Sequence, residues 1–353
     1  MFMQNKSIKY SEAINKALFY SMKKDKNLIC YGLGITDPKN IFSTTTGLEK
    51  EFGKERVFDV PTSENALTGI SIGAALNGTR SVVCHQRLDF FLLAMDQLVN
   101  SAAKWYYMFG SQVSVPITIR LIIGRGWGQG PTHSQNLQAW FNHIPGLKVV
   151  MPSSPEDAYN LLIASIFDPN PVVFLEHRWL HESIGPVRKK LKKLDEYGCK
   201  KIRSGKNITI ISMSYLTVEA IKAAQYLKFY FNIEAEILDI RVIKPLDLKT
   251  ILKSVSKTKK LILLDTGAED GSIANDIIAK VYKKIFESLN IAPVNLSMPN
   301  IPEPTSYQLT KNFYVNAATI VKEVLKIFKI NKKINLKSPS IHDVPGDWFK
   351  GPF

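Results

Sequence analysis

Short apolar runs alternate with segments of helical periodicity along most of the chain. Between residues 11 and 24 the apolar side chains recur at the spacing of one helix face, which predicts an amphipathic helix. The run at 28–31 is continuously apolar and is bounded by charged residues and a glycine, as is typical of a strand buried on both faces of a parallel sheet. The same two patterns then repeat towards the C-terminus.

This repetition predicts an α/β fold of two doubly wound domains. In the first half we expect further strands at 56–60, 81–85, 115–123, 149–151 and 172–176, and helices at 64–78, 92–109 and 155–167. In the second half we expect strands at 207–212, 234–238 and 260–264, and helices at 217–231, 248–254, 272–289 and 317–328. The domains are then residues 1–186 and 207–330, the charged segment 187–206 is a linker, and 331–353 is a polar tail whose aromatic end we expect to dock on a partner surface.

Three polar segments follow predicted strands of the first domain. Glu64 follows the strand at 56–60, residues 85–90 follow the next strand, and the glycine-rich loop 124–135 follows the strand at 115–123. Because ligands of doubly wound sheets lie beyond the carboxyl ends of the strands, we expect these segments to converge on one edge.

The net charge bears on whether the protein binds nucleic acid. The formal charge of +15 is compatible with a nucleic-acid surface, but the lysines are spread, with dense groups at 189–193, 257–260 and near the C-terminus, and no nucleic-acid motif accompanies them. A solvated basic surface is the favoured interpretation, and an acidic protein partner is the alternative. We therefore expect no nucleic-acid partner.

The cysteines and the apolar runs indicate the compartment. The three cysteines, Cys30, Cys84 and Cys199, are too widely spaced to indicate a disulfide framework or a zinc site. No apolar run approaches the ~20 residues that span a bilayer, and the first residues lack the apolar centre of a signal peptide. We expect a cytoplasmic enzyme that does not bind a membrane.

The segment 58–78 carries the first candidate catalytic residue. Pro61 favours an extended backbone, and Ser63 and Glu64 stand where they can cap the helix that follows. Gly69 and Gly73 lie four residues apart, so one helix face there has no side chains and permits a close backbone approach. On spacing alone, Glu64 is either a plain capping residue or a carboxylate held for chemistry.

A family resemblance favours a catalytic role for Glu64. Residues 59–64, Asp-Val-Pro-Thr-Ser-Glu, and the glycine-containing helix after them resemble the pyrimidine-binding domain of thiamine-diphosphate enzymes. More narrowly, they resemble the beta subunit of the decarboxylating component of 2-oxo acid dehydrogenases, the pyruvate dehydrogenase type. Four stretches agree with that family in order and spacing, at 95–104, 132–135, 145–152 and 240–247. The resemblance covers about residues 6–328 and implies a transketolase-like C-terminal domain in the second half.

The resemblance implies roles for individual residues. Glu64 matches the glutamate that hydrogen-bonds the aminopyrimidine of thiamine diphosphate and so promotes loss of the thiazolium proton. His133 matches a histidine that handles protons of the substrate or of acyl transfer. Phe90 matches an aromatic side chain that packs on the aminopyrimidine, and Gln86 lies in the same cofactor-binding strip.

His85 and Arg87 depart from the usual family pattern. Both add hydrogen-bond donors beside the expected cofactor site. They either form a structural cluster with Asp89 or bind an anionic substrate such as a carboxylate or a sugar phosphate. The second possibility belongs to an alternative function, a thiamine-diphosphate-dependent carboligase or transketolase-like subunit that acts on a sugar or another non-lipoyl acceptor. A non-catalytic scaffold subunit is a further alternative.

The family also carries a potassium ion held largely by backbone carbonyls. By register its ligands here are Ile117, Ser165, Asp168 and Asn170. The stretch Asp168-Pro-Asn-Pro is equally compatible with an ordinary turn.

The expected partners follow from what the sequence lacks. It contains no Gly-Asp-Gly stretch followed about 25 to 30 residues later by Asn, the family's magnesium and diphosphate motif. The resemblance therefore implies a separate alpha subunit that holds magnesium, in an alpha2-beta2 assembly. Residues 265–272 lack the Gly-Trp pair that is common where such subunits bind a lipoyl acyltransferase. The missing pair counts against binding to that acyltransferase, which is the second partner that the resemblance implies.

Overall fold

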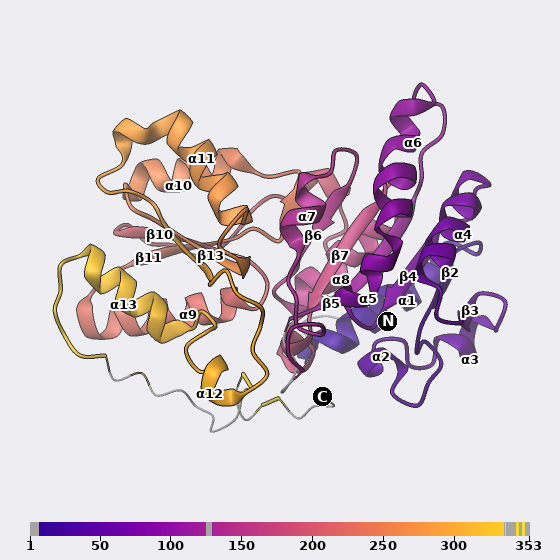
Figure 1. Cartoon of the computed structure of the whole chain (residues 1–353), viewed down its shortest axis with the longest axis horizontal. Helices are drawn as coiled ribbons and strands as arrows, with labels where there is room; N and C mark the ends of the chain where they lie inside the picture. Colours follow the sequence, from indigo (N-terminus) through magenta and orange to yellow (C-terminus); the bar gives the residue numbers. More distant parts are fainter. Residues whose placement is uncertain (1–6, 125–128, 335, 337–343, 346–347, 350–353) are drawn as a thin grey trace.

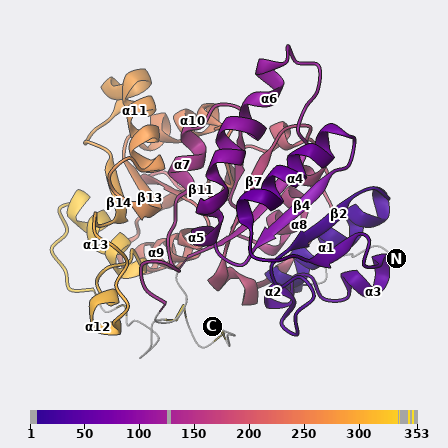
Figure 2. The same ribbon diagram turned by 45° about the vertical axis from the view of Figure 1, so that its right-hand side comes forward.

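The chain folds around two sheets that lie side by side, one in each half, as both views of the ribbon show (Figure 1 and Figure 2). The computed structural model describes residues 7–124, 129–334, 336, 344–345 and 348–349. Helices cover the sheets, which confirms the predicted α/β class. Residues 125–128 of the glycine-rich loop and most of the tail beyond 336 lie outside the described residues, so the predictions made for them stay predictions.

The first sheet has the strand order β12-β6-β7-β5-β4-β2-β3. Its parallel strands are β2 (Ile29–Gly32), β3 (Val57–Asp59), β4 (Ser81–His85), β5 (Ile117–Ile123), β6 (Lys148–Val150) and β7 (Val172–His177). Its helices are α1 (Tyr10–Lys24), α2 (Asn40–Ser43), α3 (Leu48–Phe52), α4 (Glu64–Leu76), α5 (Leu88–Phe91), α6 (Ala103–Met108), α7 (Gln138–His143) and α8 (Pro155–Ile166). A separate two-stranded sheet pairs β1 (Ser7–Lys9) with β8 (Ile184–Pro186).

The second sheet has the order β14-β13-β10-β11-β9. Its strands are β9 (Lys200–Arg203), β10 (Ile208–Ser212), β11 (Ala235–Asp239), β13 (Leu261–Ala268) and β14 (Val294–Met298), all parallel except β9. Its helices are α9 (Leu216–Phe231), α10 (Leu248–Thr258), α11 (Ile273–Ile285), α12 (Tyr307–Thr310) and α13 (Ala317–Ile327). Within the described residues, no helix combines the length and the apolar character needed to cross a membrane.

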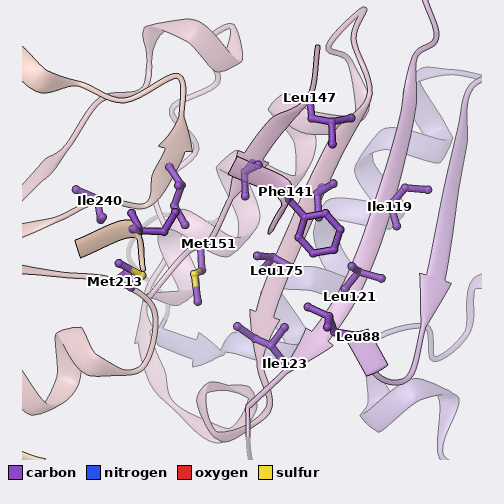
Figure 3. Close-up of a cluster of buried hydrophobic side chains, with 14 of the residues drawn as sticks. Leu88, Ile119, Leu121, Ile123, Phe141, Leu147, Met151, Leu175, Met213 and Ile240 are labelled. Carbon is purple, nitrogen blue, oxygen red and sulfur yellow. The ribbon is translucent and has the colours of Figure 1, made fainter. Parts of the chain in front are cut away.

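The two halves share one hydrophobic core. Strand β12 (Val242–Lys244) leaves the second half and adds an antiparallel strand to the first sheet, beside β6. Figure 3 shows Met213 and Ile240 of the second half next to Met151 of the first, within one continuous cluster of buried side chains. Burial of apolar surface between the halves therefore fixes their relative position.

Two predicted segments differ from the structure. The single helix expected at 92–109 is divided into a 3-10 turn at Leu92–Ala94, a π-helical stretch at Gln97–Ala102 and then α6, which projects away from the sheet in Figure 1. The segment expected as an irregular linker contains β9, which pairs with β11 at the edge of the second sheet. Its sequence, Lys-Lys-Ile-Arg, carries little apolar signal because an edge strand is largely solvated.

The C-terminal aromatic residues pack on their own chain. Phe349 is 5% exposed, and its ring lies 5.0 Å from the guanidinium carbon of Arg178. The ring of Phe42 lies 4.1 Å from the same carbon. The guanidinium is thus stacked between two rings, which is a favourable cation–π arrangement. For Phe349, the predicted docking on a partner surface is therefore wrong.

Candidate active site at the strand edge of the first domain

Glu64 lies where β3 gives way to α4. It is the first residue of α4, and only 4% of its surface is exposed. Among the described residues, no side chain or backbone group hydrogen-bonds its carboxylate. The predicted cap by Ser63 is wrong, because Ser63 has φ −163° and ψ 65° and its hydroxyl makes no cap hydrogen bond. The carboxylate is therefore shielded from water, and its hydrogen-bonding capacity is not used by the described residues.

The Asp59 side chain at the end of β3 binds the turn that follows β2. Asp59 accepts hydrogen bonds from the backbone N–H groups of Gly34, Ile35 and Thr36, at 2.6, 3.1 and 3.0 Å. Burial opposes its ionisation, but these bonds and the Thr36 hydroxyl hold the pKa of Asp59 below its usual value. Gly34 has φ +77°, and a Cβ there would overlap the Gln86 side chain. Gln86 consequently lies against the 34–36 turn.

His85 is a buried side chain. It is 2% exposed, and its ring meets the ring of Phe91 edge-on with centroids 5.0 Å apart. Burial lowers the pKa of His85 to about 4, so the imidazole is neutral at neutral pH. Within the described part of the chain, neither ring nitrogen has a hydrogen-bond partner.

Phe90 and His133 meet at the same edge. Their ring centroids are 5.4 Å apart and their planes are at 89°, so one ring presents its edge to the face of the other. The backbone N–H of His133 donates to the carbonyl of Gly130 at 3.3 Å, and its Nδ1 lies 3.0 Å from the Thr132 hydroxyl. The structure thus brings together two residues that the sequence assigned to one site.

Arg87 and Asp89 each bind the loop that carries His133. Arg87 Nη1 donates to the carbonyl of Gly124 at 3.3 Å, and Nη2 donates to the side chain of Gln129. Asp89 accepts from the Gln135 side chain at 2.7 Å. Burial lowers the pKa of Arg87 to about 10, and the negative charge of Asp89 partly offsets this effect. Among the described residues, no hydrogen bond or ion pair joins Asp89 to Arg87 or His85, so the predicted pairing with Asp89 is wrong; Arg87 and Asp89 instead each contact the loop.

The second half contributes two further residues. A Cβ on Gly130, which has φ +68°, would overlap the Thr305 hydroxyl, so Thr305 packs directly on the loop. Glu303 lies two residues before Thr305, and burial raises its pKa, with the charge of Asp89 as a further cause. Sequence analysis missed both residues, because the contact between Gly130 and Thr305 joins segments 175 residues apart and leaves no local pattern.

Comparison with known proteins decides the family. The model of the transketolase pyrimidine-binding domain matches residues 6–182, and that of the transketolase C-terminal domain matches 198–320. The pyruvate dehydrogenase E1 component subunit beta of Rhizobium meliloti (strain 1021) is 36% identical over 89% of this chain and 68% of its own. The same subunit of Rickettsia conorii (strain ATCC VR-613 / Malish 7) is 35% identical over 90% of this chain and 97% of its own. The chain belongs to the family of beta subunits of thiamine-diphosphate-dependent 2-oxo acid dehydrogenases.

One further relative and one solved structure are also similar to this chain. The beta subunit of acetoin:2,6-dichlorophenolindophenol oxidoreductase from Cupriavidus necator (strain ATCC 17699 / DSM 428 / KCTC 22496 / NCIMB 10442 / H16 / Stanier 337) is 36% identical over 91% of this chain and 97% of its own. A solved structure described as a split gene transketolase, inactive beta4 tetramer, covers 92% of this chain and is itself covered to 99%, with a TM-score of 0.71 and 18% identity. At that identity the second likeness concerns the fold alone.

In this dehydrogenase-family beta subunit, the predicted potassium ligands Asp168 and Asn170 lie in the turn after α8, whereas Ser165 lies in the last turn of α8 and Ile117 is the first residue of β5. Asp168 accepts from Asn170 at 2.9 Å and from Lys148 at 2.7 Å. Arg80 Nη1 lies 3.3 Å from the carbonyl of Ile166 and 3.1 Å from that of Asp168. The two carbonyls therefore converge on one positively charged atom. The carbonyl of Ser165, near the end of α8, accepts from the backbone N–H of Asp168 at 3.2 Å.

Proposed function

We propose that this beta subunit takes part in decarboxylating a 2-oxo acid of the pyruvate type and in passing on the acyl unit, as a cytoplasmic enzyme. The observation that carries the proposal is the Glu64 carboxylate, 4% exposed and without a hydrogen-bond partner among the described residues. Burying a carboxylate without partners is costly, so its retention favours a role toward a ligand.

The residues at this edge fit thiamine diphosphate. Glu64 would hydrogen-bond a ring nitrogen of the aminopyrimidine, and the half-buried ring of Phe90 would pack on it, with Gln86 beside them. When bound, the cofactor supplies a nucleophilic carbon for the 2-oxo group and accepts the electron pair released with carbon dioxide. His133 would exchange a proton with the substrate or the acyl acceptor, since the ring of Phe90 and the Thr132 hydroxyl fix its imidazole.

An alpha subunit would complete the site. Its proposed contribution is the magnesium and diphosphate half, for which this sequence has no Gly-Asp-Gly motif. The relatives named above are themselves described as beta subunits, which supports a paired assembly such as alpha2-beta2. A lipoyl acyltransferase as acyl acceptor is part of the same proposal.

A potassium ion bound near Ile117, Ser165, Asp168 and Asn170 belongs to this proposal too. The convergence of two carbonyls on Arg80 Nη1 supports it, because this turn already presents oxygen atoms to a cation. Bound potassium would require Arg80 to move from its present position. A higher melting temperature in potassium chloride than in sodium chloride at equal ionic strength would support the ion.

The experiment that tests the function is reconstitution. The chain is co-purified with its alpha subunit, and thiamine-diphosphate and magnesium binding are measured for the pair and for each chain alone. Pyruvate decarboxylation is then followed with an artificial electron acceptor. We expect tight cofactor binding by the pair only, together with turnover. Binding without turnover of pyruvate or other 2-oxo acids would contradict the proposed reaction, and no binding by the pair would contradict the proposed cofactor site.

A further inference from the structure

The guanidinium of Arg87 joins the two sides of a loop. Its Nη1 binds the carbonyl of Gly124, the residue that follows β5, and its Nη2 binds the side chain of Gln129. These acceptors are five residues apart in the chain. A planar guanidinium is suited to such bridging because its donors diverge in a fixed plane.

We propose that Arg87 is a positioning residue that fixes the loop carrying His133, and that it does not bind substrate. This inference rests on the proposed function, because the loop matters only if His133 takes part in the reaction. It assigns to Arg87 a role different from the anion recognition that the sequence suggested.

Residues 87, 89 and 90 contact the loop before His133, after it and at His133 itself. Arg87 binds it before His133, the Phe90 ring meets the His133 ring, and Asp89 binds Gln135 after it. Gln129 directly precedes Gly130, whose carbonyl accepts from the backbone N–H of His133. Fixing Gln129 therefore fixes the turn from which the imidazole projects.

Burial argues against a direct role in anion binding. Arg87 is 4% exposed, and both of its terminal nitrogens donate to the loop. The nearby Arg178 is 1% exposed and lies between the rings of Phe42 and Phe349. Burial, and then the positive charge of Arg87, lower the pKa of Arg178 to about 10. Each cation is thus held by groups of this chain.

The first test follows loop mobility by amide hydrogen exchange in the reconstituted complex. Arg87→Met should speed exchange of residues 129–136 by about tenfold, because a buried charged donor is lost from the loop. Gln129→Ala removes only one acceptor and should give a smaller increase at the same residues. The matched control is Arg56→Met, since Arg56 likewise donates to carbonyls, those of Met22, Asp25 and Leu28, away from this loop.

The second test is a double-mutant cycle on turnover. Arg87→Met should lower kcat by about tenfold or more with little change in KM, and the loss should largely disappear in a His133→Ala background. Arg87→Lys should restore only part of kcat, because a single ammonium group cannot reproduce the planar fork. Arg56→Met should be additive with His133→Ala.

Two results would overturn the proposal. One is unchanged exchange of residues 129–136 in Arg87→Met. The other is an additive loss accompanied by a large rise in KM, which would restore Arg87 as a substrate ligand. The exchange experiment does not depend on turnover. If the wild-type pair binds cofactor but decarboxylates no 2-oxo acid, the proposed function fails. The exchange experiment still decides whether Arg87 anchors the loop.

Discussion

The ring of Phe90 meets the imidazole of His133 edge-on, at 5.4 Å between centroids and 89° between planes. The contact joins the segment after β4 to the loop after β5, so one aromatic side chain borders both the expected cofactor position and the expected proton carrier. Arg87 and Asp89 bind the loop before and after His133 and so hold the loop against the Phe90 ring.

Phe90→Leu should weaken cofactor binding and turnover in the reconstituted complex by roughly threefold to tenfold. The leucine keeps apolar volume but loses the ring contact, and such aromatic contacts contribute about 0.5–1.5 kcal/mol. Titration calorimetry and steady-state kinetics measure the two effects. Phe229→Leu is the control, because this side chain is 81% exposed on α9. Equal affinity and turnover in both variants would remove Phe90 from the site.

Glu64→Gln should reduce turnover by roughly 100-fold or more, the range expected for a group that assists proton transfer. The amide has nearly the same size, and Glu64 makes no ion pair within the described residues, so the melting temperature should change little. Circular dichroism and the decarboxylation assay measure both quantities. The control is Glu55→Gln, which changes an exposed glutamate. An active Glu64→Gln complex would contradict the assignment.

Gly130→Ala should lower the turnover of the reconstituted complex, whereas Gly78→Ala, in a comparable turn, should not. A Cβ at Gly130 would overlap the Thr305 hydroxyl and so displace the backbone that precedes His133. Gly78→Ala is a matched control, because Gly78 also has positive φ, at +86°, but nothing lies within 4 Å of its added Cβ. Both variants should lose about 1 kcal/mol from backbone strain. A Gly130→Ala enzyme with wild-type kcat would show that Thr305 does not hold the loop.

Asp239→Asn should stabilise the protein at pH 8 but not at pH 4. Asp239 is fully buried at the junction of the halves, where it accepts from Ser153, and burial followed by the charge of Asp157 raises its pKa to about 7. Because this folded-state pKa exceeds the unfolded value, the carboxyl contributes stability below pH 4 that is lost as pH rises through 7.

Melting temperatures between pH 4 and pH 8 measure this difference. We expect a gain of roughly 1–4 kcal/mol for Asp239→Asn at pH 8, given a shift of about three pKa units in a buried carboxyl. Glu55→Gln is again the exposed control, and its effect should not depend on pH in this range. A pH-independent effect of Asp239→Asn would show that Asp239 does not titrate between pH 4 and 7.

Local sequence pattern predicted most of the elements that position the site. The apolar runs gave β4 with the same limits, 81–85, and placed β2, β5 and β7 within two residues, because strands buried on both faces are continuously apolar. The two edge strands of the second sheet, β9 and β14, were missed because they are only partly buried. In β14 only Met298 is buried, so its apolar pattern is too weak to predict a strand.

The sequence by itself determined the family and the α/β class, and it predicted Glu64 and His133 as the residues of the chemistry. These rest on short motifs and on strand order, which are local properties. Only the tertiary structure decided what surrounds them: Arg87 across the loop, Thr305 against Gly130, and β12 joining the first sheet. Such contacts form between distant segments when the shared core is buried, so shape and burial specify them and no spacing along the chain predicts them.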